Sequence, residues 1–205
     1  MKIKLGQARI GDQSGISIAC RLRKYNVNKR KVAVIARAVC DYLGVRDHEL
    51  SVNMVSSKVI QDLNKRFRGI DQPTDILSFP QREWSRLPRV SAKAAFRDVA
   101  AKLVSRGAKR INPLFLAETL GPKTLGDLVI SLQDAEKNAE RIGHGLDREL
   151  CFLMVHGILH LCGYDHEDLK QEKVMCAAQR RLMAFLSTMR SGSTPVWTHC
   201  VKRTV

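Results

Sequence analysis

The segment from about Asp147 through Leu161 constrains the fold of this chain more than any other feature. Its residues are hydrophobic almost all round a helix, so this helix is predicted to lie buried at the centre of the protein. Two histidines, His156 and His160, interrupt the apolar surface. Buried imidazole rings need partners for both ring nitrogens, so the two histidines indicate a binding site on the central helix.

Helical and strand patterns surround this segment. Apolar residues at helical spacing predict four further helices, over 30–44, 57–69, 133–143 and 167–190. Apolar runs with β-branched residues predict three strands, over 49–57, 72–80 and 125–132. Pro73 and Pro80 frame the second strand and favour a position near a sheet edge, because proline cannot donate a ladder hydrogen bond.

The length of the chain bounds its organisation. A chain of 205 residues suits one globular domain with a sizeable core, and we predict a single domain over 1–190. The last residues, 191–205, combine turn formers with little periodicity and are predicted to form a flexible C-terminal tail. No stretch is apolar for long enough to cross a bilayer, so no membrane partner is expected.

The chain carries a large excess of positive charge. Lys and Arg number 35 against 20 Asp and Glu, which gives a net charge of +15. Such an excess favours polyanionic partners through counterion release, with a basic but uninvolved surface as the alternative. Nearly half of the excess falls within 81–124, where an apolar stripe predicts a basic helical insertion.

The histidines follow a pattern that is typical of a metal site. His156 and His160 are four residues apart, so they project from one face of a helix about one turn apart. Gly163 can end the helix and let the chain turn back, which brings His166 to the same place. A lone histidine is more often a core residue, but three imidazoles with an open fourth position are typical of catalytic zinc, and also suit nickel or copper. Cys162 lacks the spacing to join them and is predicted to be a packed thiol.

The same offsets occur in metalloproteases of the H-E-x-x-H-x-x-G-x-x-H type. In those proteases the glutamate after the first histidine is the general base. This chain has Gly157 at that position, and glycine can neither take nor give a proton. Peptide hydrolysis is therefore the least favoured of the functions considered.

The complete motif is more specific than its histidines. Residues 156–166 read HGILHLCGYDH, which resembles the signature of the YbeY family of rRNA-maturation factors and single-strand-specific zinc endoribonucleases. Two further segments are similar to the same family, RGIDQPTDILSFP over 68–80 and LGDLVIS over 125–131. With the helices between them, these matches cover most of residues 30–188.

The resemblance implies a fold and a site. The fold is a single α+β domain, with a small mixed β-sheet packed with helices, a central metal-bearing helix and a metalloprotease-like topology. His156, His160 and His166 become the ligands of one Zn²⁺ ion. Arg68 becomes the positively charged residue that faces the metal and clamps the scissile phosphate. Without the family, Arg68 is a solvated arginine at a helix end.

Asp165 stands next to the third histidine, and two roles are open for it. It can orient a histidine or the reacting water as part of the catalytic site, or it can cap the helix that follows. Asp75 and Asp127 are predicted to be structural, at the beginnings of strands. Ser78 is predicted to line the cleft without a chemical role.

The resemblance also implies a substrate and partners. The expected function is metal-dependent endoribonuclease action in rRNA maturation, at the 3′ end of small-subunit rRNA, together with small-subunit assembly. A ribosome assembly factor with weak or lost nuclease activity is the alternative. The expected partners are rRNA and the small ribosomal subunit, with its proteins or assembly factors. The insertion 81–124 departs from the family, and its concentrated charge favours an RNA or ribosomal-protein contact over a tolerated surface loop.

Several features bear on the compartment. The six cysteines show no C-x-x-C spacing, which favours a reducing environment. The basic N-terminus with its single acid Asp12, the insertion and the irregular C-terminal segment favour a mitochondrial or other organellar location. The bacterial cytoplasm is the alternative.

Overall fold

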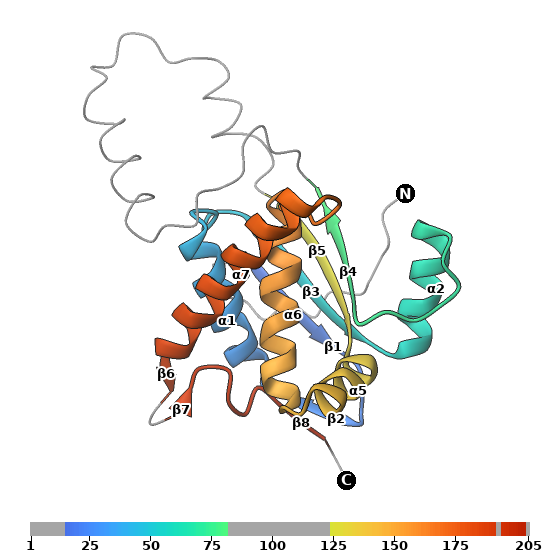
Figure 1. Ribbon diagram of the computed structural model, residues 1–205. Coiled ribbons are helices and arrows are strands. Elements are labelled where there is room, and N and C mark those ends of the chain that lie inside the picture. Colours follow the sequence, from blue (N-terminus) through green and yellow to red (C-terminus); the bar gives the residue numbers. More distant parts are fainter. Residues whose placement is uncertain (1–14, 82–123, 192–193, 204–205) are drawn as a thin grey trace, which may run out of the picture.

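The computed structural model describes residues 15–81, 124–191 and 194–203. The basic insertion predicted over 81–124 therefore lies outside the described residues except at its two ends. Within the described ranges, five helices pack on a small four-stranded sheet (Figure 1). The predicted α+β class with a small mixed sheet is confirmed.

Three parallel strands and one antiparallel strand make up the main sheet. In spatial order they are β1 (Ile16–Cys20), β3 (Glu49–Val55), β5 (Thr124–Ser131) and β4 (Ile76–Pro80). β4 runs antiparallel to β5 and stands at the edge, as predicted from its prolines. β1 is not among the predicted strands, and only Ile18 of its five residues is buried. Two small pairs join β2 (Tyr25–Val27) to β8 (Val201–Arg203) and β6 (Arg190–Ser191) to β7 (Thr194–Pro195).

The helices match the five that the periodicity predicts. They are α1 (Lys29–Tyr42), α2 (Ser57–Arg68), α5 (Leu132–Ile142), α6 (Leu146–Leu161) and α7 (Leu169–Thr188). Four of them begin with a side chain that accepts a hydrogen bond from the first turn, namely Asn28, Ser56, Ser131 and Asp168. α6 begins after Gly145 without a side-chain cap. Its stability therefore depends on burial rather than on its ends.

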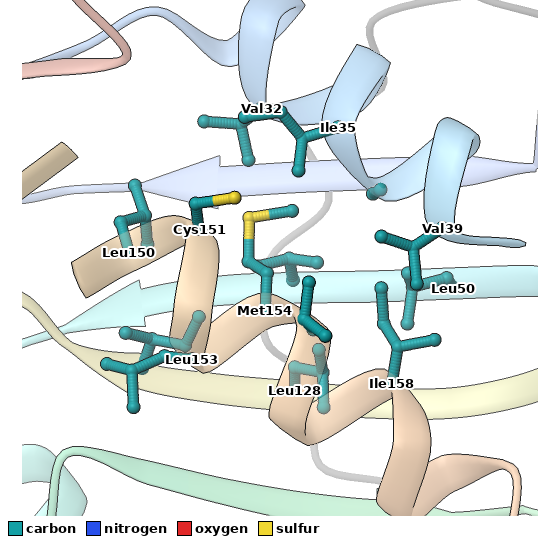
Figure 2. Packing of buried hydrophobic residues seen from close by; sticks show 14 of the residues in the cluster. Val32, Ile35, Val39, Leu50, Leu128, Leu150, Cys151, Leu153, Met154 and Ile158 are labelled. Atoms are coloured by element: carbon teal, nitrogen blue, oxygen red, sulfur yellow. The ribbon is translucent and has the colours of Figure 1, made fainter. Parts of the chain in front are cut away.

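α6 is the centre of the hydrophobic core, as its sequence predicts. α1 and α7 pack against it on one side of the sheet (Figure 1). Figure 2 shows Met154 and Ile158 of α6 among Val39 of α1, Leu50 of β3 and Leu128 of β5. Burying a side chain of this size contributes about 1.5–3 kcal/mol. None of the described helices combines the length and the hydrophobicity needed to span a bilayer.

A smaller apolar cluster lies on the opposite face of the sheet. Successive residues of β5 alternate between the two faces, so Leu128 and Ile130 join the main core whereas Val129 joins Ile60 and Leu77. Ile60 belongs to α2, which therefore covers this second face. The sheet thus separates α2 from α6.

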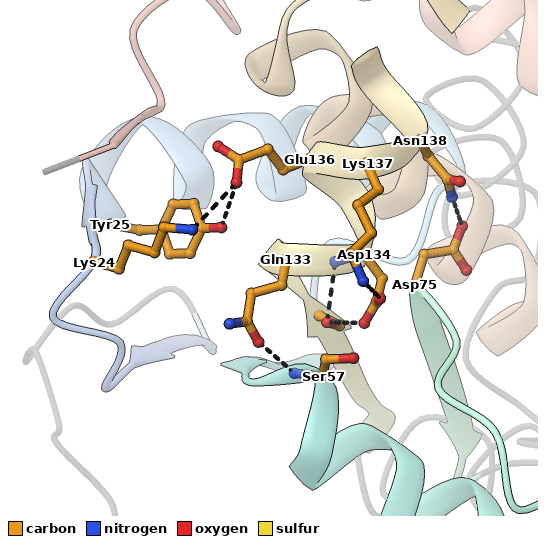
Figure 3. A network of polar contacts seen from close by, with 10 residues as sticks. Lys24, Tyr25, Ser57, Asp75, Gln133, Asp134, Glu136, Lys137 and Asn138 are labelled. Atoms are coloured by element: carbon orange, nitrogen blue, oxygen red, sulfur yellow. Dashed lines mark hydrogen bonds and ion pairs between the residues drawn. The ribbon is translucent and has the colours of Figure 1, made fainter. Parts of the chain in front are cut away.

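Polar contacts fasten α5 to β2 and to the start of β4 (Figure 3). Glu136 accepts a hydrogen bond from the Tyr25 hydroxyl at 2.8 Å. Asn138 donates to the Asp75 carboxylate at 2.9 Å. These contacts hold the start of the edge strand against the helix that leads into α6.

The C-terminal segment packs against the rest of the protein. The sequence predicts a flexible tail over 191–205, whereas β8 pairs with β2 and both Cys200 and Val201 are buried. Asp147, in the first turn of α6, accepts hydrogen bonds from the backbone N–H groups of His199 at 2.8 Å and of Val201 at 2.7 Å. Apolar burial and this carboxylate therefore order a segment whose composition alone suggests a loose chain.

Candidate metal centre

The three histidines of the motif converge on one point. His156 and His160 project from the same side of α6, and their Nε2 atoms are 3.1 Å apart. His166 follows in the turn after α6, and one donor atom from each of the three residues lies within 4.8 Å of the others. The structure therefore brings together all the residues that the sequence predicts as metal ligands.

The turn between α6 and α7 explains how His166 reaches the helix. Gly163 adopts a φ of 83°, in the left-handed region that favours glycine, and its N–H donates to the carbonyl of His160 at 2.9 Å. The chain then reverses, so that the ring of His166 lies over that of His156 with centroids 5.8 Å apart. The predicted role of Gly163 is confirmed.

Gln179 of α7 holds the ring of His156. Its side-chain oxygen lies 3.3 Å from Nδ1 of His156. This oxygen accepts from the tautomer that carries its proton on Nδ1, which is the tautomer that keeps the lone pair of Nε2 for a metal. Gln179 is only 8% exposed, and its amide nitrogen has no hydrogen-bond partner among the described residues. A buried amide nitrogen without a hydrogen-bond partner costs free energy, and residues that carry this cost are typical of functional sites.

Burial keeps His156 and His160 neutral. Burial, followed by the neighbouring His156 and His166, lowers the pKa of His160 to about 4. Burial also lowers the pKa of His156, against the opposing effect of its hydrogen bond to Gln179. At neutral pH both rings therefore carry the lone pair that metal coordination requires.

The donor set fits a transition metal such as zinc. Nitrogen ligands about 2.0–2.1 Å from a tetrahedral ion lie about 3.4 Å from one another. The 3.1 Å between the Nε2 atoms of His156 and His160 is close to that spacing. His166 is exposed in the turn after α6, and its donor atom lies within 4.8 Å of those of the other two histidines. Three imidazoles leave a fourth position for water or substrate.

Gly157 stands where α6 presses on the sheet. A Cβ atom here would lie 2.7 Å from Cδ1 of Ile76 in β4 and 2.7 Å from Cδ2 of Leu128 in β5, too close for van der Waals contact. A glutamate here, as in H-E-x-x-H proteases, would have to displace the side-chain ends of Ile76 and Leu128. Close packing thus explains the glycine, and it gives no support to peptide hydrolysis.

Asp165 does not cap α7. Asp168 has that role, because its carboxylate accepts hydrogen bonds from two backbone N–H groups of the first turn, each at 2.8 Å. Asp165 instead accepts a hydrogen bond from the backbone N–H of His166 at 2.8 Å, and it lies 3.9 Å from Nδ1 of His160. The predicted cap is therefore wrong, and the other predicted role, the orientation of a histidine or the reacting water, stays a prediction with which these two contacts are compatible.

Arg68 is the last residue of α2 and is exposed. α2 packs through Ile60 on the face of the sheet opposite α6. The ring of Phe67, the neighbour of Arg68, meets that of Phe79 in β4 at a centroid distance of 5.2 Å, so Arg68 lies near the edge strand. Within the described part of the chain, no hydrogen bond or ion pair joins Arg68 to the histidines. Its contact with a scissile phosphate stays a prediction.

The remaining polar residues of the motif segments are distributed around the sheet. Ser78 lies two residues along β4 from Ile76, whose side chain faces Gly157, so Ser78 points from the same face as α6. Asp75 accepts a hydrogen bond from α5 and is structural, as predicted. Asp127 lies inside β5 rather than at its beginning.

Cys162 is a packed thiol, as its spacing predicts. It has no exposed surface, and burial raises the pKa of its thiol far above the ordinary value. The thiolate is the form that binds metal, so Cys162 does not compete for the ion.

The sequence patterns do not identify Gln179 as part of the site. α7 buries an apolar stripe that consists of Met175, Ala178, Leu182 and Leu186. Gln179 falls within this stripe, and a polar residue on an apolar stripe is the one signal that the sequence offers. The packing of α7 against α6 decides that its partner is His156.

Similar proteins identify the family of this chain. A family model described as Endoribonuclease YbeY matches residues 17–187. A curated relative from Halalkalibacterium halodurans, named Endoribonuclease YbeY, is 37% identical over 144 residues, which cover 70% of this chain and 76% of the relative. A relative of the same name from Aquifex aeolicus is 35% identical over 156 residues, which cover 76% and 81%. A solution structure from Thermotoga maritima aligns with a TM-score of 0.49 and 24% identity over 82% of this chain and 86% of that one.

The family model and the two curated relatives confirm the resemblance that the histidine motif carries. The family model spans most of the described residues, including all of α6 and its turn. The chain belongs to the endoribonuclease YbeY family.

Proposed function

We propose that this protein is a metal-dependent endoribonuclease that acts in the maturation of ribosomal RNA, at the 3′ end of the small-subunit RNA. The observation that carries the proposal is the cluster of His156, His160 and His166 in a chain whose curated relatives are named endoribonucleases. The net charge of +15 supports a polyanionic substrate.

The three histidines are proposed to hold one zinc ion, which in such sites activates water and neutralises charge that develops on a phosphodiester. His156 and His160 offer neutral nitrogens because burial lowers the pKa of both rings. Gln179 keeps the proton of His156 on Nδ1, and Asp165 fixes the backbone at His166. The three nitrogens are therefore held close together before an ion binds.

Arg68 is proposed to pair with a phosphate of the substrate. A guanidinium can pair with two phosphate oxygens at once, which orients as well as neutralises them. Because Arg68 lies on α2, beyond the edge strand β4, one RNA strand can touch both Arg68 and the histidines only where it crosses β4. The substrate path is therefore proposed to pass over this strand, on the side where Ser78 lies.

The proposed partner is the small ribosomal subunit with its proteins or assembly factors. The concentrated charge of segment 81–124 supports a contact with RNA or with a ribosomal protein. We propose a mitochondrial or other organellar location for this ribosome, with the bacterial cytoplasm as the alternative. Fluorescence microscopy of the full chain, fused at its C-terminus, distinguishes the two.

The test of the activity is cleavage of a 3′-extended small-subunit rRNA by zinc-loaded wild-type protein beside His160→Ala protein purified in the same way. The cuts are mapped at nucleotide resolution. We expect defined cuts that disappear in His160→Ala. Equal cutting by both proteins would come from a contaminating ribonuclease and would contradict the proposal.

Cys176→Ala is the matched control for metal binding outside the cluster. Cys176 is the exposed cysteine of the six, so its thiol is the one most open to adventitious zinc. This variant is expected to cut like the wild-type protein. If no protein cuts although zinc binds normally, the assembly-factor function is favoured, and the accumulation of immature small subunits on depletion is the next measurement.

A further inference from the structure

One row of residues on α6 reaches the surface. From Arg148 to the end of the helix, every residue is buried except Arg148, Phe152, His156 and His160. They recur at intervals of four, so they form a single stripe with steps of about 6 Å. We call this row the α6 stripe. Two proposed metal ligands occupy one end of it, and an aromatic ring and a cation occupy the other.

Phe152 exposes a large apolar ring beside the histidines. Its residue surface is 41% exposed, although it belongs to the most buried helix of the protein. The ring is nearly parallel to that of His156, with an interplanar angle of 13° and a centroid distance of 6.3 Å. Exposed aromatic rings beside a basic or polar groove are typical positions for base stacking in proteins that bind single-stranded nucleic acid.

Arg148 lies one turn further along the same stripe. Its side chain is exposed and forms no ion pair with a carboxylate of the described residues. A guanidinium that is not engaged by a carboxylate is available for a phosphate. The step along the stripe is comparable with the separation of successive phosphates in an extended strand.

We propose that Phe152 and Arg148 form a nucleotide subsite that continues from the histidines. The base of a nucleotide beside the scissile phosphate stacks on Phe152, and the next phosphate pairs with Arg148. A stacked base has to be unpaired, so the subsite takes a single-stranded segment. The inference rests on the proposed function, because it takes RNA as the substrate.

The test separates stacking from charge. Binding of fluorescein-labelled oligouridine to zinc-free protein is measured by anisotropy, beside an oligomer of equal length and charge with abasic sugars. We expect Phe152→Ala to weaken oligouridine binding about tenfold and to leave the abasic oligomer unaffected, whereas Phe152→Tyr retains both affinities. Arg148→Gln is expected to weaken both oligomers and to lower the slope of log affinity against log salt by about 0.7.

Val34→Ala is the control for the loss of an exposed apolar side chain. Val34 lies on α1, is 48% exposed and borders β1 at the far edge of the sheet. It is expected to bind both oligomers like the wild-type protein. Circular dichroism establishes that each variant is folded before binding is compared.

Three results would overturn the subsite. They are unchanged oligouridine binding by folded Phe152→Ala, equal weakening of both oligomers by that variant, and absence of oligouridine binding by the wild-type protein. If Phe152→Ala loses zinc affinity but still binds oligouridine like the wild-type protein, the ring serves the metal site alone, and the subsite is likewise excluded. Failure of the proposed function has a different outcome, in which wild-type protein binds oligouridine and does not cut rRNA when zinc is present.

Discussion

At the scale of single residues, the histidine cluster depends on partners that need not touch the ion. Gln179 fixes the proton of His156, and Asp165 holds the backbone at His166. Each acts through geometry that exists before metal binds. Measurements of metal affinity and of folding stability therefore test these residues more directly than activity does.

Gln179→Leu should weaken zinc binding by about 10- to 100-fold, because it removes the acceptor that fixes the His156 tautomer while it keeps a similar volume. Competition with a chromogenic chelator measures the affinity. Gln179→Glu keeps a hydrogen-bond acceptor for His156 and should retain most of the zinc affinity. Gln171→Leu, at an exposed glutamine of the same helix, is the control. A folded Gln179→Leu protein with wild-type zinc affinity would show that the contact has no such role.

The pKa of His160 predicts how the stability of the metal-free protein depends on pH. Its folded-state value of about 4 lies below the ordinary value of 6.5. Between these values the unfolded chain binds more protons, so the free energy of unfolding falls as the pH is lowered. The slope from this group is at most about 1.4 kcal/mol per pH unit, and partial exposure of the ring reduces it.

Urea unfolding of metal-free protein between neutral and mildly acidic pH measures this dependence. His160→Gln should flatten the curve, because its amide does not titrate. Equal pH dependence in the variant and the wild-type protein would assign the effect to other groups.

At the scale of elements, α6 joins the core to the site. Its apolar surface packs on the sheet and on α1, and the α6 stripe faces outward with the histidines. Gly157 belongs to the buried part, and it allows the helix to approach β4 and β5. The position of the histidines over the sheet therefore depends on a residue that takes no part in coordination.

Gly157→Glu should destabilise the fold by more than about 3 kcal/mol, because it places a carboxylate in the packed layer between α6 and the sheet. Thermal and urea unfolding measure the loss. The variant restores an H-E-x-x-H sequence, and it should still fail to cleave casein. A stable variant whose proteolysis is inhibited by a chelator would contradict the conclusion that Gly157 is required for the packing of α6 on the sheet.

At the scale of the whole molecule, the C-terminal segment joins β2 and the first turn of α6. β8 pairs with β2, and the Asp147 carboxylate accepts the N–H groups of His199 and Val201. Contacts between residues so far apart in the sequence form only when the chain is folded. The C-terminal segment therefore contributes to the cooperative stability of the fold.

Asp147→Ala should lower the free energy of unfolding by about 2–4 kcal/mol, because it removes two charge-assisted hydrogen bonds. Asp147→Asn keeps one acceptor oxygen and should lose less. Asp41→Ala is the control, since the exposed pair of Asp41 with Arg46 should contribute less than about 1 kcal/mol. Urea unfolding compares the three variants, and an equal effect of Asp147→Ala and Asp41→Ala would exclude ordering of the C-terminal segment by this carboxylate.

Local sequence patterns predict the helices and strands whose formation depends on residues close together in the sequence. The five helices and the strands β3, β4 and β5 follow from periodicity that spans one element. β1, β2 and β8 have only five, three and three residues, so their pairing with distant strands leaves almost no local signal. Local patterns fail to predict the order of the C-terminal segment for the same reason.

The metal centre also combines features that local sequence predicts with features that depend on the packing of distant elements. Local pattern is enough to predict the three histidines and Gly163, because two of the histidines stand one turn apart on a helix and the glycine ends that helix before the third. Only the folded arrangement shows that Gln179 meets His156, and that α2, which ends at Arg68, packs on the sheet face opposite α6. Those facts depend on how separate elements pack, and packing is set by contacts between residues that the chain order keeps apart.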